Sequence, residues 1–162
     1  MAMRIEMYHA SKFGNGAMVA AELKKVMESK GAVIDVHHVD DASPKEIPPA
    51  DLYVFSSPGR FGKPIKEMRK FLKKLQLPAG SRYVLLATEM NPAANGTSVT
   101  APTEGELGAC QMVIPMMEET LREKGLLKVA EGKVFVTGIK GPLEDRWRAK
   151  VEELSATLLR LS

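Results

Sequence analysis

Two patterns of apolar positions alternate along this chain of 162 residues. Short apolar segments predict strands, and between them apolar residues recur at the spacing of one helix face. The predicted strands are residues 3–8, 33–39, 52–55, 83–87 and 133–137. The segments 52–55 and 83–87 are apolar throughout, which is typical of central parallel strands covered on both faces.

The apolar pattern predicts the first helix, and prolines predict the form of the connection after the second strand. In residues 16–30, Val19, Leu23 and Met27 share one face, and Gly31 follows at a C-cap position. The segment 40–50 contains three prolines and is expected to hold a turn or a short helical piece at most.

Prolines mark the remaining helices. Pro64 and Pro142 are each interpreted as lying in the first turn of a helix, where a missing N–H is tolerated. Pro115 falls inside a helical pattern at 104–124, so that helix is expected to kink or to start closer to Pro115.

The alternation of strands and helices predicts a single α/β domain over residues 1–162. We expect a three-layer, doubly wound sandwich with a five-stranded parallel sheet in the order 2-1-3-4-5. In such sheets ligands bind beyond the carboxyl ends of the strands, at the switch point between strands one and three. The loops that follow Tyr8, Phe55 and Ala87 are therefore the candidate site.

The loop after the first strand has the chemistry of a phosphate-binding turn. Gly14 and Gly16 allow a tight turn, and the helix that follows presents the positive end of its dipole to an anion. Ser11 and Asn15 add side-chain hydrogen bonds, and Lys12 adds positive charge. The alternative interpretation is a Gly-rich turn without a ligand.

The second loop, residues 56–64, combines two glycines, Gly59 and Gly62, with the aromatic residue Phe61. An aromatic side chain at this edge of the sheet can stack on a flat ring. The alternative is that Phe61 folds back into the core. The third loop, residues 88–96, contains no aromatic residue and can line the far wall of a ring pocket through its backbone.

These loops resemble the motifs of flavodoxins. Ser11 and the pair Gly14-Asn15 match the phosphate-binding motif T-x-T-G-N-T, from which Phe13 and Gly16 depart. The second loop matches the flavodoxin form S-S-P-x-x-x-G-x-P at Ser56, Ser57, Pro58, Gly62 and Pro64.

The resemblance implies one bound FMN, with the phosphate on residues 11–16. Its ring would lie between the Phe61 loop and the loop after Thr88, and a peptide near Gly59 to Gly62 would contact the flavin N5. The protein would supply placement and electrostatics, and the flavin the chemistry. The implied cofactor-binding residues are Ser11, Lys12, Phe13, Gly14, Asn15, Gly16, Ser57, Pro58, Gly59, Arg60, Phe61, Gly62, Thr88, Glu89 and Met90.

Composition narrows the class of protein. A hydrophobic fraction of 44% and a charged fraction of 27% are ordinary for a globular chain, and no apolar segment approaches the length of a membrane span. The net charge of +3 is too small to indicate nucleic-acid binding. Cys110 is the single cysteine and is interpreted as a buried hydrophobe, so neither a disulfide framework nor a cysteine metal site is expected. We expect a cytoplasmic protein with no metal, as a monomer or a homodimer.

Three functions stay open at this point. The first is an FMN electron carrier that delivers electrons to a partner protein. The second is an FMN-dependent oxidoreductase that reduces a small molecule, such as a quinone, a porphyrin precursor or free flavin, with Ala93, Ala94 and Gly96 leaving room for it. The third is a flavin-free binding module of the same fold. A lysine-rich helix face at residues 63–74 indicates that a redox partner could be acidic.

Overall fold

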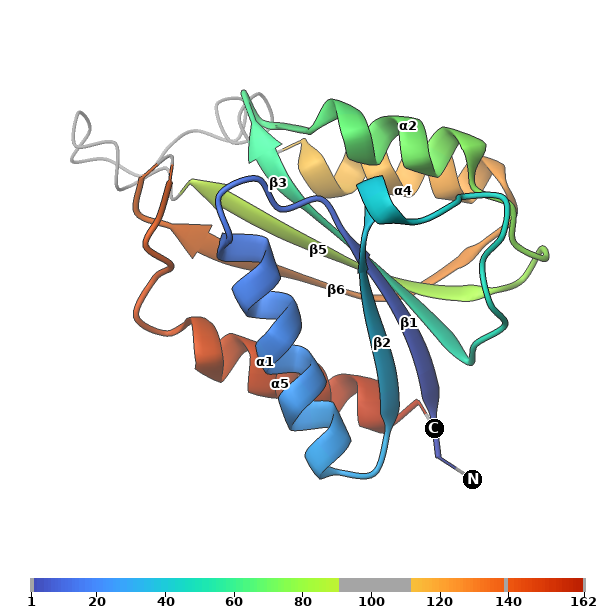
Figure 1. The fold of residues 1–162 in the computed structure, drawn as a ribbon, viewed down its shortest axis with the longest axis horizontal. Coiled ribbons are helices and arrows are strands. Elements are labelled where there is room, and N and C mark those ends of the chain that lie inside the picture. Colours follow the sequence, from blue (N-terminus) through green and yellow to red (C-terminus); the bar gives the residue numbers. More distant parts are fainter. Residues whose placement is uncertain (1, 91–111, 139, 162) are drawn as a thin grey trace.

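The computed structural model describes residues 2–90, 112–138 and 140–161 (Figure 1). Its strands are β1 (Arg4–His9), β2 (Val33–His38), β3 (Leu52–Arg60), β4 (Lys63–Pro64), β5 (Arg82–Met90) and β6 (Leu127–Val136). Its helices are α1 (Asn15–Ser29), α2 (Lys66–Lys74), α4 (Val113–Glu123) and α5 (Trp147–Leu159), with a short 3₁₀ turn, η1 (Val39–Asp41).

The sheet has the order β2-β1-β3-β5-β6, and these neighbours are all parallel. The two-residue strand β4 pairs antiparallel with the end of β3 and stands outside this path. When β4 is left out and the other five strands are renumbered in chain order, the sheet order is 2-1-3-4-5, which confirms the prediction. Parallel pairing brings the carboxyl ends of the strands to one edge of the sheet, where His9 is level with Ser56.

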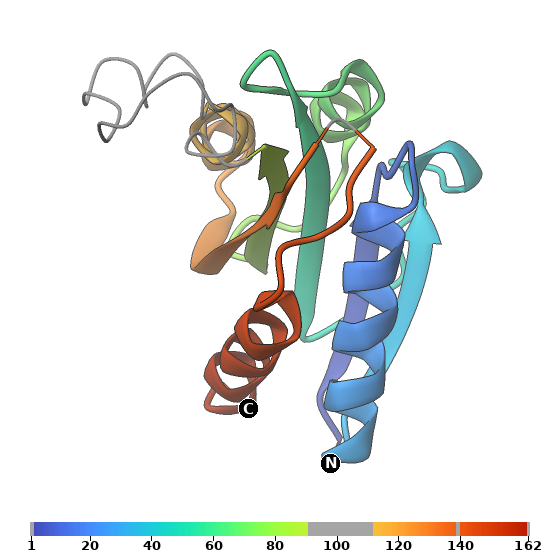
Figure 2. The ribbon, with the colours of Figure 1, turned by 90° about the vertical axis from the view of Figure 1, so that its left-hand side faces the viewer.

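Two apolar cores lie on opposite faces of the sheet, as the predicted three layers require (Figure 2). On one face α1 and α5 bury residues such as Leu23, Val151 and Leu158 against β1, β3 and β5. On the other face α2 and α4 bury Leu72 and Met117. The fully buried strand residues explain why the sequence pattern located the central strands.

Strands β3 and β5 both extend beyond their predicted ends at Phe55 and Ala87. They stay paired as far as Pro58 and Thr88, because the parallel ladder continues where the apolar run stops. Residues 56–60, expected in a loop, therefore lie in a strand that turns back at β4. This part of the carboxyl edge is therefore formed by paired strands and not by a loop.

Both helix starts assigned to prolines were wrong. Pro64 lies in β4, and α2 begins two residues later at Lys66. Pro142 precedes α5 by several residues, since α5 begins at Trp147, and the Pro142 carbonyl accepts a hydrogen bond from Thr137 N–H at 2.9 Å. A fixed φ suits an extended edge as well as a helical first turn, so proline alone does not separate the two.

Other expectations were met. Helix α4 starts at Val113, close to Pro115, and the link after β2 holds only the η1 turn. Gly31 follows α1 with a φ of 91°, as expected at a C-cap. Among the described residues, none of the helices is long and apolar enough to cross a membrane.

Candidate functional site

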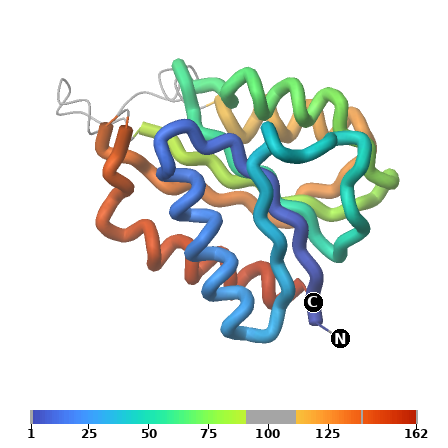
Figure 3. Tube along the Cα trace, viewed as in Figure 1, coloured from blue at the N-terminus to red at the C-terminus, as the bar shows by residue number. Residues whose placement is uncertain are grey.

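The loops after β1 and β6 and the β3–β4 hairpin meet at the carboxyl edge of the sheet (Figures 2 and 3). The loop after β1 is held through Ser11. The Ser11 N–H donates to Nδ1 of His9 at 3.3 Å, and the Ser11 carbonyl oxygen lies 3.0 Å from Nε2 of His38. The Ser11 Oγ accepts from Gly14 N–H at 3.1 Å, and no described group accepts the Ser11 hydroxyl hydrogen. That hydrogen is therefore available to a ligand.

His9 and His38 support this loop from the ends of β1 and β2. Both use Nδ1 as an acceptor of a backbone N–H, from Ser11 and from Asp40, which fits neutral rings protonated at Nε2. Burial, and secondarily the nearby His38, lower the pKa of His9. Sequence analysis did not identify this role, because it depends on contacts that the ends of two neighbouring strands make with the loop.

Helix α1 begins at this loop with unpaired donors. Gly14 precedes it with a φ of 94°, a conformation in which a Cβ atom is disfavoured. The first intrahelical bond recorded is from Met18 N–H to the Gly14 carbonyl, and no described group accepts the N–H of Asn15, Gly16 or Ala17. These N–H groups and the helix dipole make an electropositive end that favours an anion.

The connection between β6 and α5 packs against the same loop. A Cβ on Gly141 would lie 2.6 Å from Oδ1 of Asn15, so the Asn15 amide rests directly on the Gly141 backbone. The Nζ of Lys140 lies 5.6 Å from the ring centroid of Phe13, which is 57% exposed. Lys140 is thus a cation beside the start of α1 that sequence analysis did not single out.

Lys12, predicted to add charge to a phosphate site, reaches across to α2. Its Nζ lies 2.8 Å from Oε1 of Glu67, and the hydrogen bond from Lys12 lowers the pKa of that carboxyl group. This ion pair ties the loop after β1 to the first turn of α2. It also compensates part of the Lys12 charge.

The β3–β4 hairpin turns at Phe61 and Gly62. Their φ values of 53° and 76° are both positive, as in a type I′ turn. Phe61 is the one described non-glycine residue with a positive φ, and it is 89% exposed, so the alternative in which it fills the core is excluded. The Phe61 ring is therefore exposed to solvent. Its backbone adopts a left-handed conformation, which costs a non-glycine residue about 1–2 kcal/mol.

Ser57 has a structural role within this hairpin. Its side chain is fully buried, its Oγ donates to the Pro58 carbonyl at 2.9 Å, and it accepts from Ile65 N–H at 3.3 Å. The Gly62 carbonyl accepts from Met112 N–H at 2.6 Å, which joins the turn to the start of α4. These bonds fix the position from which Phe61 projects.

The end of β5 supplies the third part of the edge. Thr88 and Glu89 are 4% and 3% exposed, and Met90 is half-buried. Neither carboxylate oxygen of Glu89 has a hydrogen-bond partner among the described residues, although Lys133 Nζ lies 3.5 Å from Oε2. Expectations for Ala93, Ala94, Gly96 and Cys110 fall outside the described residues.

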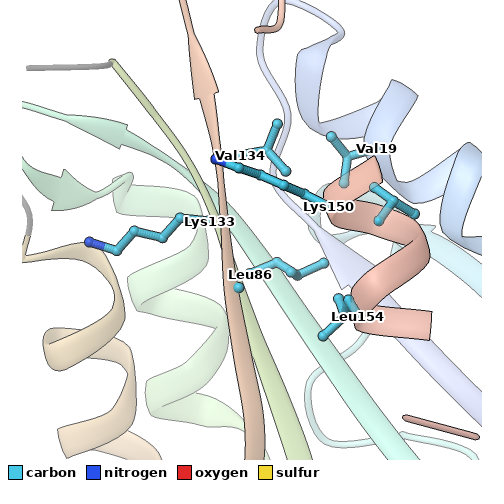
Figure 4. A pocket seen from close by; sticks show the side chains of 8 residues that line it. Val19, Leu86, Lys133, Val134, Lys150 and Leu154 are labelled. Atoms are coloured by element: carbon cyan, nitrogen blue, oxygen red, sulfur yellow. The ribbon is translucent and has the colours of Figure 1, made fainter. Parts of the chain in front are cut away.

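Two hollows lie away from this edge. A cavity of about 30 Å³ lies between β6 and α5 (Figure 4). It is lined mainly by apolar residues such as Leu86, Val134 and Leu154. That volume accommodates about one water molecule. A groove of about 170 Å³ runs between α2 and α4. The described residues contain no cluster of three or more potential metal ligands from His, Cys, Asp and Glu.

Comparison with solved structures gives matches over nearly the whole chain. Flavodoxin 2 from Bacillus cereus superposes with a TM-score of 0.72 at 16% identity, covering 98% of this chain and 99% of that one. A flavodoxin from the domain Archaea gives 0.70 at 17% identity, with 98% of both chains covered. The chain has a flavodoxin-like fold.

The same fold also occurs as part of a larger protein. Rubredoxin oxygen:oxidoreductase from Desulfovibrio gigas matches with a TM-score of 0.69 at 11% identity, covering 98% of this chain but only 35% of that one. No protein-family model matches the sequence, and no curated protein matches it. The structural matches therefore establish the flavodoxin-like fold of this chain.

Proposed function

We propose that this flavodoxin-like protein binds one FMN at the carboxyl edge of its sheet and passes electrons to a partner protein. The observation that carries the proposal is the pairing of two features at one edge. Unpaired N–H groups begin α1, and Phe61 projects from the strained turn of the β3–β4 hairpin. The first suits a phosphate and the second a flat ring.

The residues present fit such a cofactor. Ser11 Oγ–H and the N–H groups of Asn15 and Gly16 would hold the phosphate, with Lys12, Phe13, Gly14 and Lys140 around it. The departures from the flavodoxin motif at Phe13 and Gly16 remove hydroxyl donors, but the backbone donors they would supplement are present.

The ring would lie against the segment from Pro58 to Gly62, facing Thr88, Glu89 and Met90. When bound, FMN accepts and returns electrons, while the chain positions it and sets its electrostatic surroundings. Gly59 supports this position. A Cβ there would lie 3.1 Å from Val113 and 3.2 Å from Glu89, so the backbone at residue 59 is in close contact with β5 and α4.

An acidic partner protein is the expected electron acceptor or donor. Helix α2 carries five cationic residues, all exposed, and one acid, Glu67, which Lys12 already neutralises in part. They are Lys66, Arg69, Lys70, Lys73 and Lys74. Arg69 and Lys73 also line the groove between α2 and α4, next to the half-buried Met116. Cationic residues around a partly apolar groove attract a partner protein with an anionic surface and steer it toward this face.

The test is the visible absorption and fluorescence of the purified protein with added FMN. A flavin band retained through gel filtration, with quenched ring fluorescence, is expected. Unchanged FMN fluorescence would instead identify a flavin-free binding module. Rapid oxidation of reduced nicotinamide with a quinone or free flavin as acceptor would favour the small-molecule oxidoreductase.

The partner is tested separately by electron transfer to an acidic redox protein at increasing salt. The rate is expected to fall as salt screens the α2 charges. Replacing Lys70 and Lys73 by Gln should weaken this salt dependence, whereas replacing Lys25 on α1 and Lys30 at its C-cap should leave it unchanged. A rate that is independent of salt in the unmodified protein would exclude the steering role.

A further inference from the structure

Glu89 carries a buried carboxylate close to the end of β5. Only 3% of the residue is exposed, and Oε1 and Oε2 have no hydrogen-bond partner among the described residues. The Nζ of Lys133 lies 3.5 Å from Oε2, longer than a charge-assisted hydrogen bond. Buried carboxylates usually accept several hydrogen bonds, so an arrangement of this kind calls for a functional explanation.

The position of Glu89 links it to the proposed flavin site. Its Cγ would lie 3.2 Å from a Cβ on residue 59, so the side chain packs against the β3 segment proposed to contact the ring. Lys133 leaves β6 on the α4 side of the sheet, away from Leu154 of α5, and reaches the same region (Figure 4).

Among the described residues, the charged group that faces Glu89 is Lys133 of β6. From β3 the side chain packs beside Gly59, which Val113 of α4 also approaches, and neither residue carries a side-chain charge. Burial raises the pKa of Glu89, and the attraction of Lys133 opposes this only in part. The balance between the charged and the neutral carboxyl group is therefore sensitive to any further charge placed nearby.

We propose that Glu89 takes up a proton when the flavin bound beside it is reduced and releases that proton when the flavin is reoxidised. The inference rests on the proposed function, since it needs FMN at this edge. One electron passes from an external reductant to the ring, and one proton from water forms an O–H bond at a Glu89 carboxylate oxygen. The site then gains no net charge, which matters where burial makes a charge costly.

The test is a reductive titration of the FMN-loaded protein with dithionite, from about pH 5 to about pH 9. In the unmodified protein the midpoint potential should fall as pH rises from the pKa of Glu89 beside oxidised flavin to its pKa beside reduced flavin. Glu89→Gln keeps the shape and should lose that segment of the pH dependence. Proton uptake by the ring itself is common to both proteins, so the difference between their curves isolates Glu89.

Two further variants frame the result. Lys133→Met removes the opposing charge, so the window should move to higher pH. Glu119→Gln removes an exposed carboxylate on α4 and should leave the curve unchanged. If the curves of the unmodified protein and Glu89→Gln coincide while both retain FMN, Glu89 is not the proton-linked group and only this inference fails. If the unmodified protein binds no FMN, the proposed function fails as well.

A measurement on the flavin-free protein checks Glu89 independently. An acid whose pKa is higher in the folded state favours folding at low pH, and this contribution is lost as pH rises through the folded pKa. Glu89→Gln should therefore gain stability relative to the unmodified protein as pH rises above about 4.3, and the gain should vanish at lower pH. A pH-independent difference would show that Glu89 titrates normally and would overturn the inference.

Discussion

The Oε2 atom of Glu6 lies 2.8 Å from Nε2 of His37, at a point where the Glu6 side chain is only 1% exposed. The other oxygen of Glu6 lies 3.1 Å from a guanidinium nitrogen of Arg4. This buried acid has partners on both oxygens, in contrast to Glu89. We assign it to stability, because it lies midway along β1, away from the carboxyl edge.

Replacing Glu6 by Gln should therefore destabilise the fold without changing the affinity for FMN. The expected loss is about 1–3 kcal/mol, the range for hydrogen bonds to charged groups. Asp35→Asn is the control, since Asp35 also contacts Arg4 but is 46% exposed, and its loss should stay below about 0.5 kcal/mol. Urea unfolding measures both, and equal losses would contradict the distinction.

Gly14 and Gly31 provide a matched pair for testing the start of α1. Their φ values are 94° and 91°, and a Cβ at either would meet nothing within 4 Å. Each Gly→Ala change should cost about 1–2 kcal/mol of stability through the backbone alone. Only Gly14→Ala should also weaken FMN binding, as measured by fluorescence titration, because only Gly14 orients the N–H groups that face the proposed phosphate.

The contact between Asn15 and Gly141 should behave as a coupled unit. Gly141→Ala would force the Asn15 amide away, since its Cβ would approach Oδ1 to 2.6 Å. We expect weaker FMN binding in Gly141→Ala and a smaller additional effect of that change in an Asn15→Ala background. Strict additivity of the two changes in a binding titration would show that the contact is unimportant for the site.

Phe61→Gly should separate stability from binding. Glycine relieves the positive φ, so the flavin-free protein is expected to be unchanged or about 1 kcal/mol more stable in denaturant. The same change removes the proposed stacking surface, so FMN affinity should fall. Leu127→Gly is a control at another exposed apolar residue, 55% exposed, where no change in affinity is expected.

The lowered pKa of His9 predicts a loss of stability in acid. Because the folded protein binds this proton less readily than the unfolded chain, stability should fall as pH drops below about 6.5. His9→Asn retains an acceptor for Ser11 N–H without a titrating ring and should flatten this part of the curve. Urea unfolding at several pH values measures it, and identical slopes for both proteins would contradict the assignment.

The parts of the fold set by local apolar pattern could be predicted from sequence. Central strands are buried on both faces, so Leu52 to Phe55 signals β3 directly, and the strand order follows from the alternation of elements. The ends of β3 and the start of α5 could not be predicted. Ser57 and Pro142 are placed by hydrogen bonds to Ile65 and Thr137, which no local pattern contains.

The candidate site shows the same division. The Gly-rich turn before α1 and the exposed aromatic at Phe61 could be recognised from residue types in known places along the chain. The contacts that support that turn could not be recognised, because His9 and His38 reach it from the ends of β1 and β2 and Lys140 from the connection between β6 and α5. The missing hydrogen bonds of Glu89 depend on its neighbours in space and likewise leave no sequence signal.

The C-terminal end of the described chain lies at the edge of the sheet opposite to the candidate site. The Leu161 carbonyl accepts a hydrogen bond at 3.2 Å from Arg82, the first residue of β5, and β1 starts at this same end (Figure 1). A fluorescent reporter or surface tether attached at either end would leave the region around Phe61 open. The protein can therefore be immobilised on an electrode by its ends, with the proposed site facing the solution.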